Sequence, residues 1–101
     1  MAKKFKKFKT MRELYERCSG GDEQAQRICI GALQNLGCDH LADAAKRFHS
    51  NQPKWYRFWV GLNEYITALV CEYGESETKA ERTVLAEVNN VWDCCDDVEL
   101  T

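Results

Sequence analysis

The residues that could do chemistry in this chain are few, and their spacing does not favour catalysis. The only histidines are His40 and His49, and Cys38 lies two positions before His40. A thiol and an imidazole two positions apart on a turn rarely face each other. The sequence contains neither a glycine-rich phosphate loop nor a nucleophile elbow. We therefore expect a protein that is not an enzyme and has no catalytic residues.

Six cysteines, at positions 18, 29, 38, 71, 94 and 95, raise the question of disulfides or a metal. Cys29 and Cys71 fall within apolar helical stretches, as buried thiols do, and no secretory signal precedes them. We expect reduced thiols in a cytoplasmic protein, with three disulfides as the alternative. No CxxC or HxxxH spacing supports a zinc site, so we predict no metal and no cofactor.

Lysine and phenylalanine alternate in a basic N-terminal arm, residues 1–9. Ammonium groups neutralise phosphates, and aromatic rings stack on exposed bases, so the arm suits nucleic acid. It also suits an anionic membrane surface, or its rings pack on the rest of the protein. The sequence pI of about 5.7 counts against a dedicated nucleic-acid binder. The candidate residues of the arm are Lys3, Lys4, Phe5, Lys6, Lys7, Phe8 and Lys9.

Charge is segregated along the chain, which favours a binding role. Residues 1–17 carry a net charge of +5, residues 72–101 carry −7, and the whole chain carries −2. We expect an acidic binding surface in the last third and an acidic tail at 96–101. The predicted function is a protein–protein interaction module, an adaptor or inhibitor that occludes a basic groove of a nucleic-acid-handling partner. Nucleic-acid binding by the arm is the alternative. The candidate acidic residues are Glu72, Glu75, Glu77, Glu81 and Glu87.

The elements that must position these residues are helices, because apolar residues recur at three- and four-residue steps throughout. Thr10 with Glu13, and Thr78 with Glu81, fit capping boxes. Asp22 and Asp39 are expected N-caps of the second and third helices, and Pro53 is expected in the first turn of the fourth. The third helix is expected to bury one face made of Leu41, Ala44, Ala45 and Phe48.

The fourth helix, about residues 54–73, is predicted to be the centre of the fold because it is apolar around most of its circumference. Its main stripe is Trp55, Trp59, Leu62, Ile66, Leu69 and Tyr73. A narrow strip interrupts the apolar surface and could contact either a second copy, giving a homodimer, or another helix of the same chain. That strip is Arg57, Gly61, Glu64 and Ala68.

Length and composition complete the prediction. The 101 residues suit one domain, and no apolar run approaches the ~20 residues of a membrane span. We predict an all-α fold, a compact bundle of four to five helices over residues 1–101.

Overall fold

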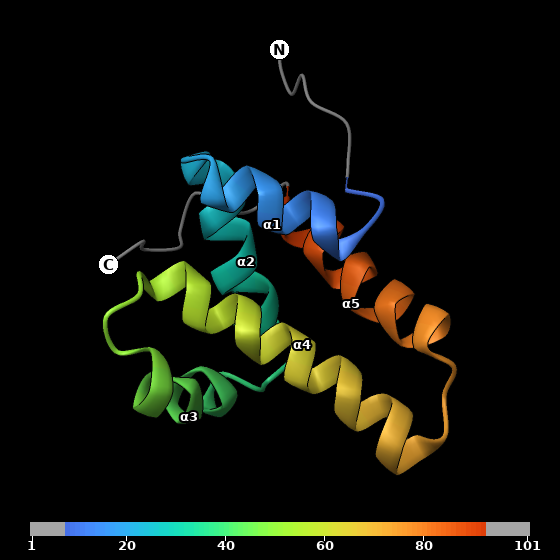
Figure 1. Cartoon of the computed structure of the whole chain (residues 1–101). Helices are drawn as coiled ribbons and strands as arrows, with labels where there is room; N and C mark the ends of the chain where they lie inside the picture. Colours follow the sequence, from blue (N-terminus) through green and yellow to red (C-terminus); the bar gives the residue numbers. More distant parts are fainter. Residues whose placement is uncertain (1–7, 93–101) are drawn as a thin grey trace.

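Five α-helices make up the fold, as the sequence predicts, and the described part of the chain contains no strand (Figure 1). The computed structural model describes residues 8–92. The helices are α1 (Met11–Ser19), α2 (Glu23–Asn35), α3 (His40–His49), α4 (Lys54–Tyr73) and α5 (Glu77–Val91). The prediction of an all-α bundle is confirmed, and α4 has the predicted bounds.

Helices α2 and α4 form the centre of the bundle. Helix α4 packs against α2, α3 and α5, while α2 also packs against α1 and α5. In Figure 1, α3 lies beside the N-terminal half of α4, away from α1 and α5. Side chains such as Leu14, Ile28, Leu33, Leu62 and Val84 are fully buried. Helix α3 therefore joins the bundle almost entirely through α4.

Several helix ends follow from local sequence as predicted. The Thr10 hydroxyl accepts a hydrogen bond from the Glu13 amide, and the Glu13 carboxylate accepts one from Lys9 N–H. The Asp22 carboxylate caps α2 by accepting from two amides of its first turn. Gly74 ends α4 in the left-handed conformation, with φ of 69°, where a side chain would be strained. These contacts satisfy backbone groups that a helix terminus otherwise exposes.

Three predicted helix starts are corrected. Asp39 has helical backbone angles and makes no capping hydrogen bond through its side chain, so it is not a cap in the expected sense. Helix α5 begins two residues earlier than the predicted capping box, because Ser76 accepts from Lys79 N–H and takes the N-cap position that Thr78 was expected to hold. Pro53 is the residue before α4, not part of its first turn; its φ of −65° suits either place.

The segment before α1 is tied to α5 by polar contacts. Phe8 and Asn89 exchange two hydrogen bonds. The backbone N–H of Phe8 donates to the side-chain oxygen Oδ1 of Asn89, and the side-chain Nδ2 of Asn89 donates to the backbone oxygen of Phe8. The Phe8 ring is buried and meets Trp92 edge-on, with 5.5 Å between ring centroids. Met11 N–H donates to the Glu81 carboxylate. Phe8 is therefore part of the core.

The predicted inner face of α3 is correct at two of its four positions, because Ala45 is buried and Leu41 packs against the core. Phe48 is 82% exposed and Ala44 is also exposed, whereas Ala42, outside the predicted face, is buried. At 100° per residue, the face that meets α4 is rotated by roughly 60° from the centre of the predicted stripe. The small side chains of Ala42 and Ala45 let α3 come close to α4, and this close contact leaves the Phe48 ring outside.

Gly61 is where α4 makes its closest approach to its neighbours. A β-carbon built there would lie 2.5 Å from Leu33 Cδ2, 3.3 Å from Leu41 Cβ and 3.5 Å from Ala42 N. The strip that contains Gly61 is predicted to contact either a second copy or another helix of the same chain. At Gly61 the contact is with helices of the same chain. A second copy cannot contact Gly61 without displacing α3.

Some predictions fall outside residues 8–92 and concern parts of the chain that the structure does not describe. These are the arm residues Lys3, Lys4, Phe5, Lys6 and Lys7, the tail 96–101, and the cysteines at 94 and 95. Within the described residues, no helix combines the length and apolar character that crossing a membrane requires.

Candidate binding surface on helices α3 and α4

Two large apolar side chains are strongly exposed among the described residues, and both lie on the surface formed by α3 and α4. Phe48 is 82% exposed and Tyr73 is 72% exposed. Each lines one of two neighbouring grooves, which share Leu41 and Glu64. Exposed aromatic rings that gather at a concave surface are typical of interaction sites.

The first groove is apolar and lies between α3 and α4. Its volume is about 310 Å³, and its walls are mainly aliphatic and aromatic. It exists because Ala44 and Ala45 are small, while Phe48 and Val60 stand on either side of them. The lining residues are Leu41, Ala44, Ala45, Phe48, His49, Val60 and Glu64.

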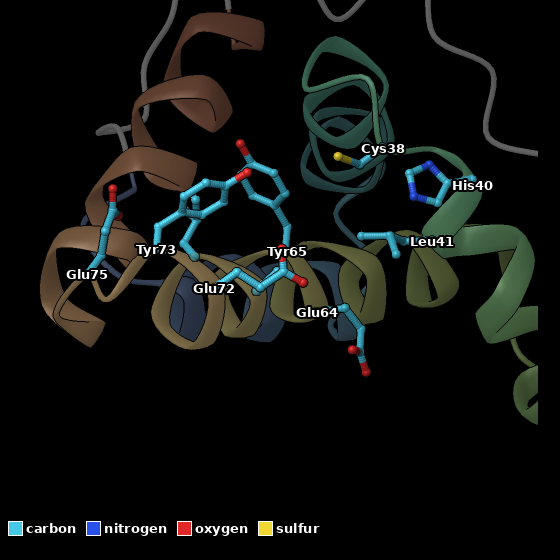
Figure 2. Close-up of a pocket in the computed structure, with 10 residues that line it drawn as sticks. Cys38, His40, Leu41, Glu64, Tyr65, Glu72, Tyr73 and Glu75 are labelled. Carbon is cyan, nitrogen blue, oxygen red and sulfur yellow. The ribbon is translucent and has the colours of Figure 1, made fainter.

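The second groove is larger, about 650 Å³, and combines aromatic with acidic side chains. Figure 2 shows Tyr65 and Tyr73 rising next to each other from α4, into the space between α5 and the turn before α3. Cys38 and His40 form the opposite wall, and Glu72 lies at the base of the tyrosines. This groove therefore has a negatively charged floor and two phenol rings as one wall.

Glu75 reaches this groove because of how α4 ends. Glu75 N–H donates back to Leu69 O at 3.3 Å, a bond that spans the glycine turn at Gly74. The turn brings the Glu75 side chain back along the last turn of α4, where it is half-buried. Its Oε1 atom is buried and has no hydrogen-bond partner within residues 8–92.

The electrostatic character of the groove is visible in Tyr65. Burial raises the pKa of the Tyr65 phenol, and the neighbouring Cys38, Tyr73 and Glu75 raise it further. Burial disfavours the phenolate, and ionisation would also place its negative charge near the Glu75 carboxylate.

Cys38 and His40 both line the larger groove, but the contacts of the described residues do not pair them as a nucleophile and a base. The Cys38 thiol donates to Leu36 O at 3.5 Å, and His40 is exposed. Burial raises the pKa of the Cys38 thiol, and the neighbouring Asp39 raises it further. A raised pKa keeps the sulfur protonated near neutral pH, which weakens it as a nucleophile. Within residues 8–92, no three histidine, cysteine or acidic side chains come together to hold a metal ion.

The five predicted acidic residues do not share one surface. Glu72 and Glu75 line the larger groove, whereas Glu77 lies beside a separate small pocket of about 240 Å³. Glu81 accepts a hydrogen bond from Met11 N–H, and Glu87 accepts one from the Asn35 amide. Glu81 and Glu87 therefore help to hold the bundle together, and only Glu72 and Glu75 join the candidate binding surface.

The predicted contact strip on α4 is divided in a similar way. Glu64 and Ala68 line the grooves, and Gly61 is buried against α2 and α3. Arg57 is half-buried, and its Nε atom has no hydrogen-bond partner in the part of the chain that the structure describes. The strip is thus partly interior and partly groove lining.

Of the described arm residues, Lys9 is exposed and Phe8 is buried. The Arg17 guanidinium lies over the Phe8 ring, 4.9 Å from its centroid. Phe8 consequently has no free face with which to stack on a base.

Three aromatic residues of this surface are not predicted from the sequence. The apolar stripes place Phe48 and Tyr73 on inner faces of their helices, and Tyr65 has no predicted role. Tyr73 is the last residue of α4 and sits directly before Gly74, so its position at a helix end was a usable signal of exposure. Nothing in the linear sequence places Tyr65 beside Cys38.

Comparison with known proteins adds no relative. No family model matches the chain, and neither the curated proteins nor the solved structures gave a match.

Proposed function

We propose that this protein is a protein–protein interaction module, an adaptor or inhibitor that docks a partner on the joined grooves of α3 and α4. The observation that carries the proposal is that Phe48 and Tyr73, the strongly exposed large apolar side chains of residues 8–92, each line one of two adjoining grooves. Burying a phenylalanine side chain is worth about 2 kcal/mol. A partner that covers Phe48 gains that free energy, about 30-fold in affinity.

Binding is proposed in preference to catalysis because of the chemistry of the groove. Burial raises the pKa of the Cys38 thiol, and the hydrogen bond of that thiol goes to the backbone oxygen of Leu36 rather than to a base. Acting by occlusion needs only a surface that competes for a partner's own binding site. An acidic, aromatic surface on the inhibitor suits a partner whose site is basic.

The proposal places the protein in the cytoplasm. Its support is that the described cysteines, Cys18, Cys29, Cys38 and Cys71, are free thiols, a state maintained in a reducing compartment.

The test is a pull-down with tagged protein, run with and without nuclease and read by mass spectrometry. The wild type is compared with a Phe48→Ala/Tyr73→Ala variant and with a Thr83→Ala/Asn90→Ala control on exposed positions of α5. We expect a discrete protein that survives nuclease, is kept by the control and is lost by the groove variant. A partner retained equally by all three would refute the assignment of the surface.

Nucleic-acid binding by the arm is the alternative that the same experiment tests. One of the two rings available for stacking is Phe8, and that ring is buried in the bundle. The described residues give this alternative no observation of its own. Nucleic acid in the untreated eluate, with protein companions lost after nuclease, would favour the arm over the grooves.

A further inference from the structure

The two grooves differ in chemistry, and that difference describes a ligand. Among residues 8–92, no lysine or arginine lines either groove. The groove beside Phe48 offers mainly aliphatic and aromatic walls, whereas the groove beside Tyr73 offers phenol rings and the carboxylates of Glu72 and Glu75. A ligand that fills both must be apolar at one point and positively charged at another.

The larger groove fits a side-chain cation in two respects. The carboxylates of Glu64, Glu72 and Glu75 line it and provide opposite charge. The Tyr65 and Tyr73 rings provide aromatic surface, over which a cation is attracted by the ring quadrupole. A guanidinium group suits all of these together, because it is planar, stacks on aromatic rings and donates in pairs to a carboxylate.

The spacing between the grooves follows from α4, which lines both. The apolar groove uses Val60 and Glu64, and the larger groove uses α4 residues from Glu64 to Tyr73. The proposed cation site at Glu72 and Tyr73 lies about ten or eleven residues beyond the middle of the Val60–Glu64 stretch, a rise of about 16 Å. In a ligand, about 16 Å corresponds to a spacing of about five residues in an extended segment, or about eleven in a helical one.

We propose that the partner presents a continuous segment whose arginine side chain enters beside Tyr73 and the carboxylates of Glu72 and Glu75, and whose aliphatic or aromatic side chain, about 16 Å away, packs on Phe48. This rests on the proposed function and makes it specific. The arginine supplies register and salt-sensitive attraction, and the apolar residue supplies buried area.

The probe for this test is a set of 12-residue peptides selected by phage display from a random library on the full-length protein. Selected peptides are synthesised with a fluorescent label and titrated by anisotropy against the wild type and single-surface variants. We expect the selected sequences to pair an arginine or lysine with an apolar residue at a separation of about five or about eleven residues. Dissociation constants should rise steeply between low and physiological salt.

The variants separate the two subsites. Glu72→Gln/Glu75→Gln should weaken binding about 10-fold or more, while Glu23→Gln, which removes an exposed charge outside both grooves, should change it less than 2-fold. A peptide whose arginine is replaced by norleucine should lose the same factor and become indifferent to the double glutamine variant. Phe48→Ala should weaken both peptides alike.

The outcomes distinguish this inference from the proposed function. Peptides that depend on Phe48 and Tyr73 but carry no basic residue, or ignore Glu72→Gln/Glu75→Gln, would overturn the inference and leave the docking surface in place. Selected peptides that all ignore Phe48→Ala and Tyr73→Ala would overturn both. A synthetic peptide of residues 1–9 is titrated in the same experiment. If it binds as tightly as the selected peptides, the occupant of the grooves is the chain's own arm, and the proposal of a segment from another protein is overturned.

Discussion

Gly61 provides a sharp test of the packing that creates the grooves. It is buried at the contact of α4 with α2 and α3, and a β-carbon there would lie 2.5 Å from Leu33 Cδ2. Leu33 is fully buried and has little room to move. On the other side, Leu41 Cβ at 3.3 Å and Ala42 N at 3.5 Å limit any shift of the new methyl group.

The expected effect of Gly61→Ala is the difference between two opposing contributions. Replacing glycine by alanine inside a helix stabilises by about 1 kcal/mol when the site is open. Overpacking a core costs about 1–3 kcal/mol. Because the three neighbouring atoms surround the site, we expect overpacking to win and the free energy of unfolding to fall by about 1 kcal/mol. For a domain of this size, that lowers the melting temperature by about 5 °C.

Urea denaturation followed by circular dichroism measures this directly. Leu33→Val removes the methyl group that the new side chain would meet, so Gly61→Ala should cost about 1 kcal/mol less in that background than in the wild type. A single Gly61→Ala variant that is more stable than the wild type would refute the close approach of the helices. So would strict additivity with Leu33→Val.

Three further predictions follow from the described contacts. Asp22→Ala removes the cap of α2 and should lower the free energy of unfolding by about 1–2 kcal/mol, whereas Asp39→Ala, which removes no cap, should cost less than about 0.5 kcal/mol in the same urea titration. Phe58→Ala, at a 7% exposed core position, should cost about 3–5 kcal/mol, whereas Phe48→Ala should leave the melting temperature almost unchanged; equal losses would contradict the burial. Burial, and to a smaller extent the Cys18 thiol, raises the pKa of the Cys29 thiol, so the native state keeps this proton at pH values where the unfolded chain loses it. The free energy of unfolding should therefore fall as the pH rises above about 9, and it should fall less in Cys29→Ala. Urea midpoints measured at about pH 7 and about pH 10 would show the difference.

The sequence predicts most of the fold because the strongest signals are local. The bounds of α4 follow from Pro53 and Gly74, which flank a long apolar stretch on its N-terminal and C-terminal sides. Asp22 is correctly predicted as a cap because the residue before it, Gly21, takes a φ of 97° that separates α1 from α2. In each case one or two neighbouring residues decide the outcome, and no distant contact is needed.

The errors arise where packing between helices decides. Asp22 directly follows Gly21, whereas Asp39 comes two residues after Gly37. The backbone of Asp39 is already helical, so its side chain makes no capping hydrogen bond to a first-turn amide. Phe48 belongs to the apolar stripe of α3, but α3 turns its alanines toward Gly61. Such a rotation depends on the shape of α4 and cannot be read from the periodicity of α3 alone.

The candidate site was predictable only in part. Acidic residues of the last third were expected to bind, and two of them, Glu72 and Glu75, line the larger groove. Glu81 and Glu87 instead accept hydrogen bonds from distant parts of the chain, Met11 and Asn35. Charge density in the sequence does not distinguish a solvated carboxylate from one that holds the fold together.

The most direct test of the docking surface is site-specific photocrosslinking. The photoreactive residue p-benzoylphenylalanine is placed at position 48, at position 73 or, as a control, at the exposed position 86 of α5, and each protein is irradiated in lysate after nuclease treatment. Docking of a partner on the two grooves predicts one crosslinked protein band of the same mass from positions 48 and 73 and none from position 86. Crosslinks of equal strength from all three positions, or from position 86 alone, would contradict it.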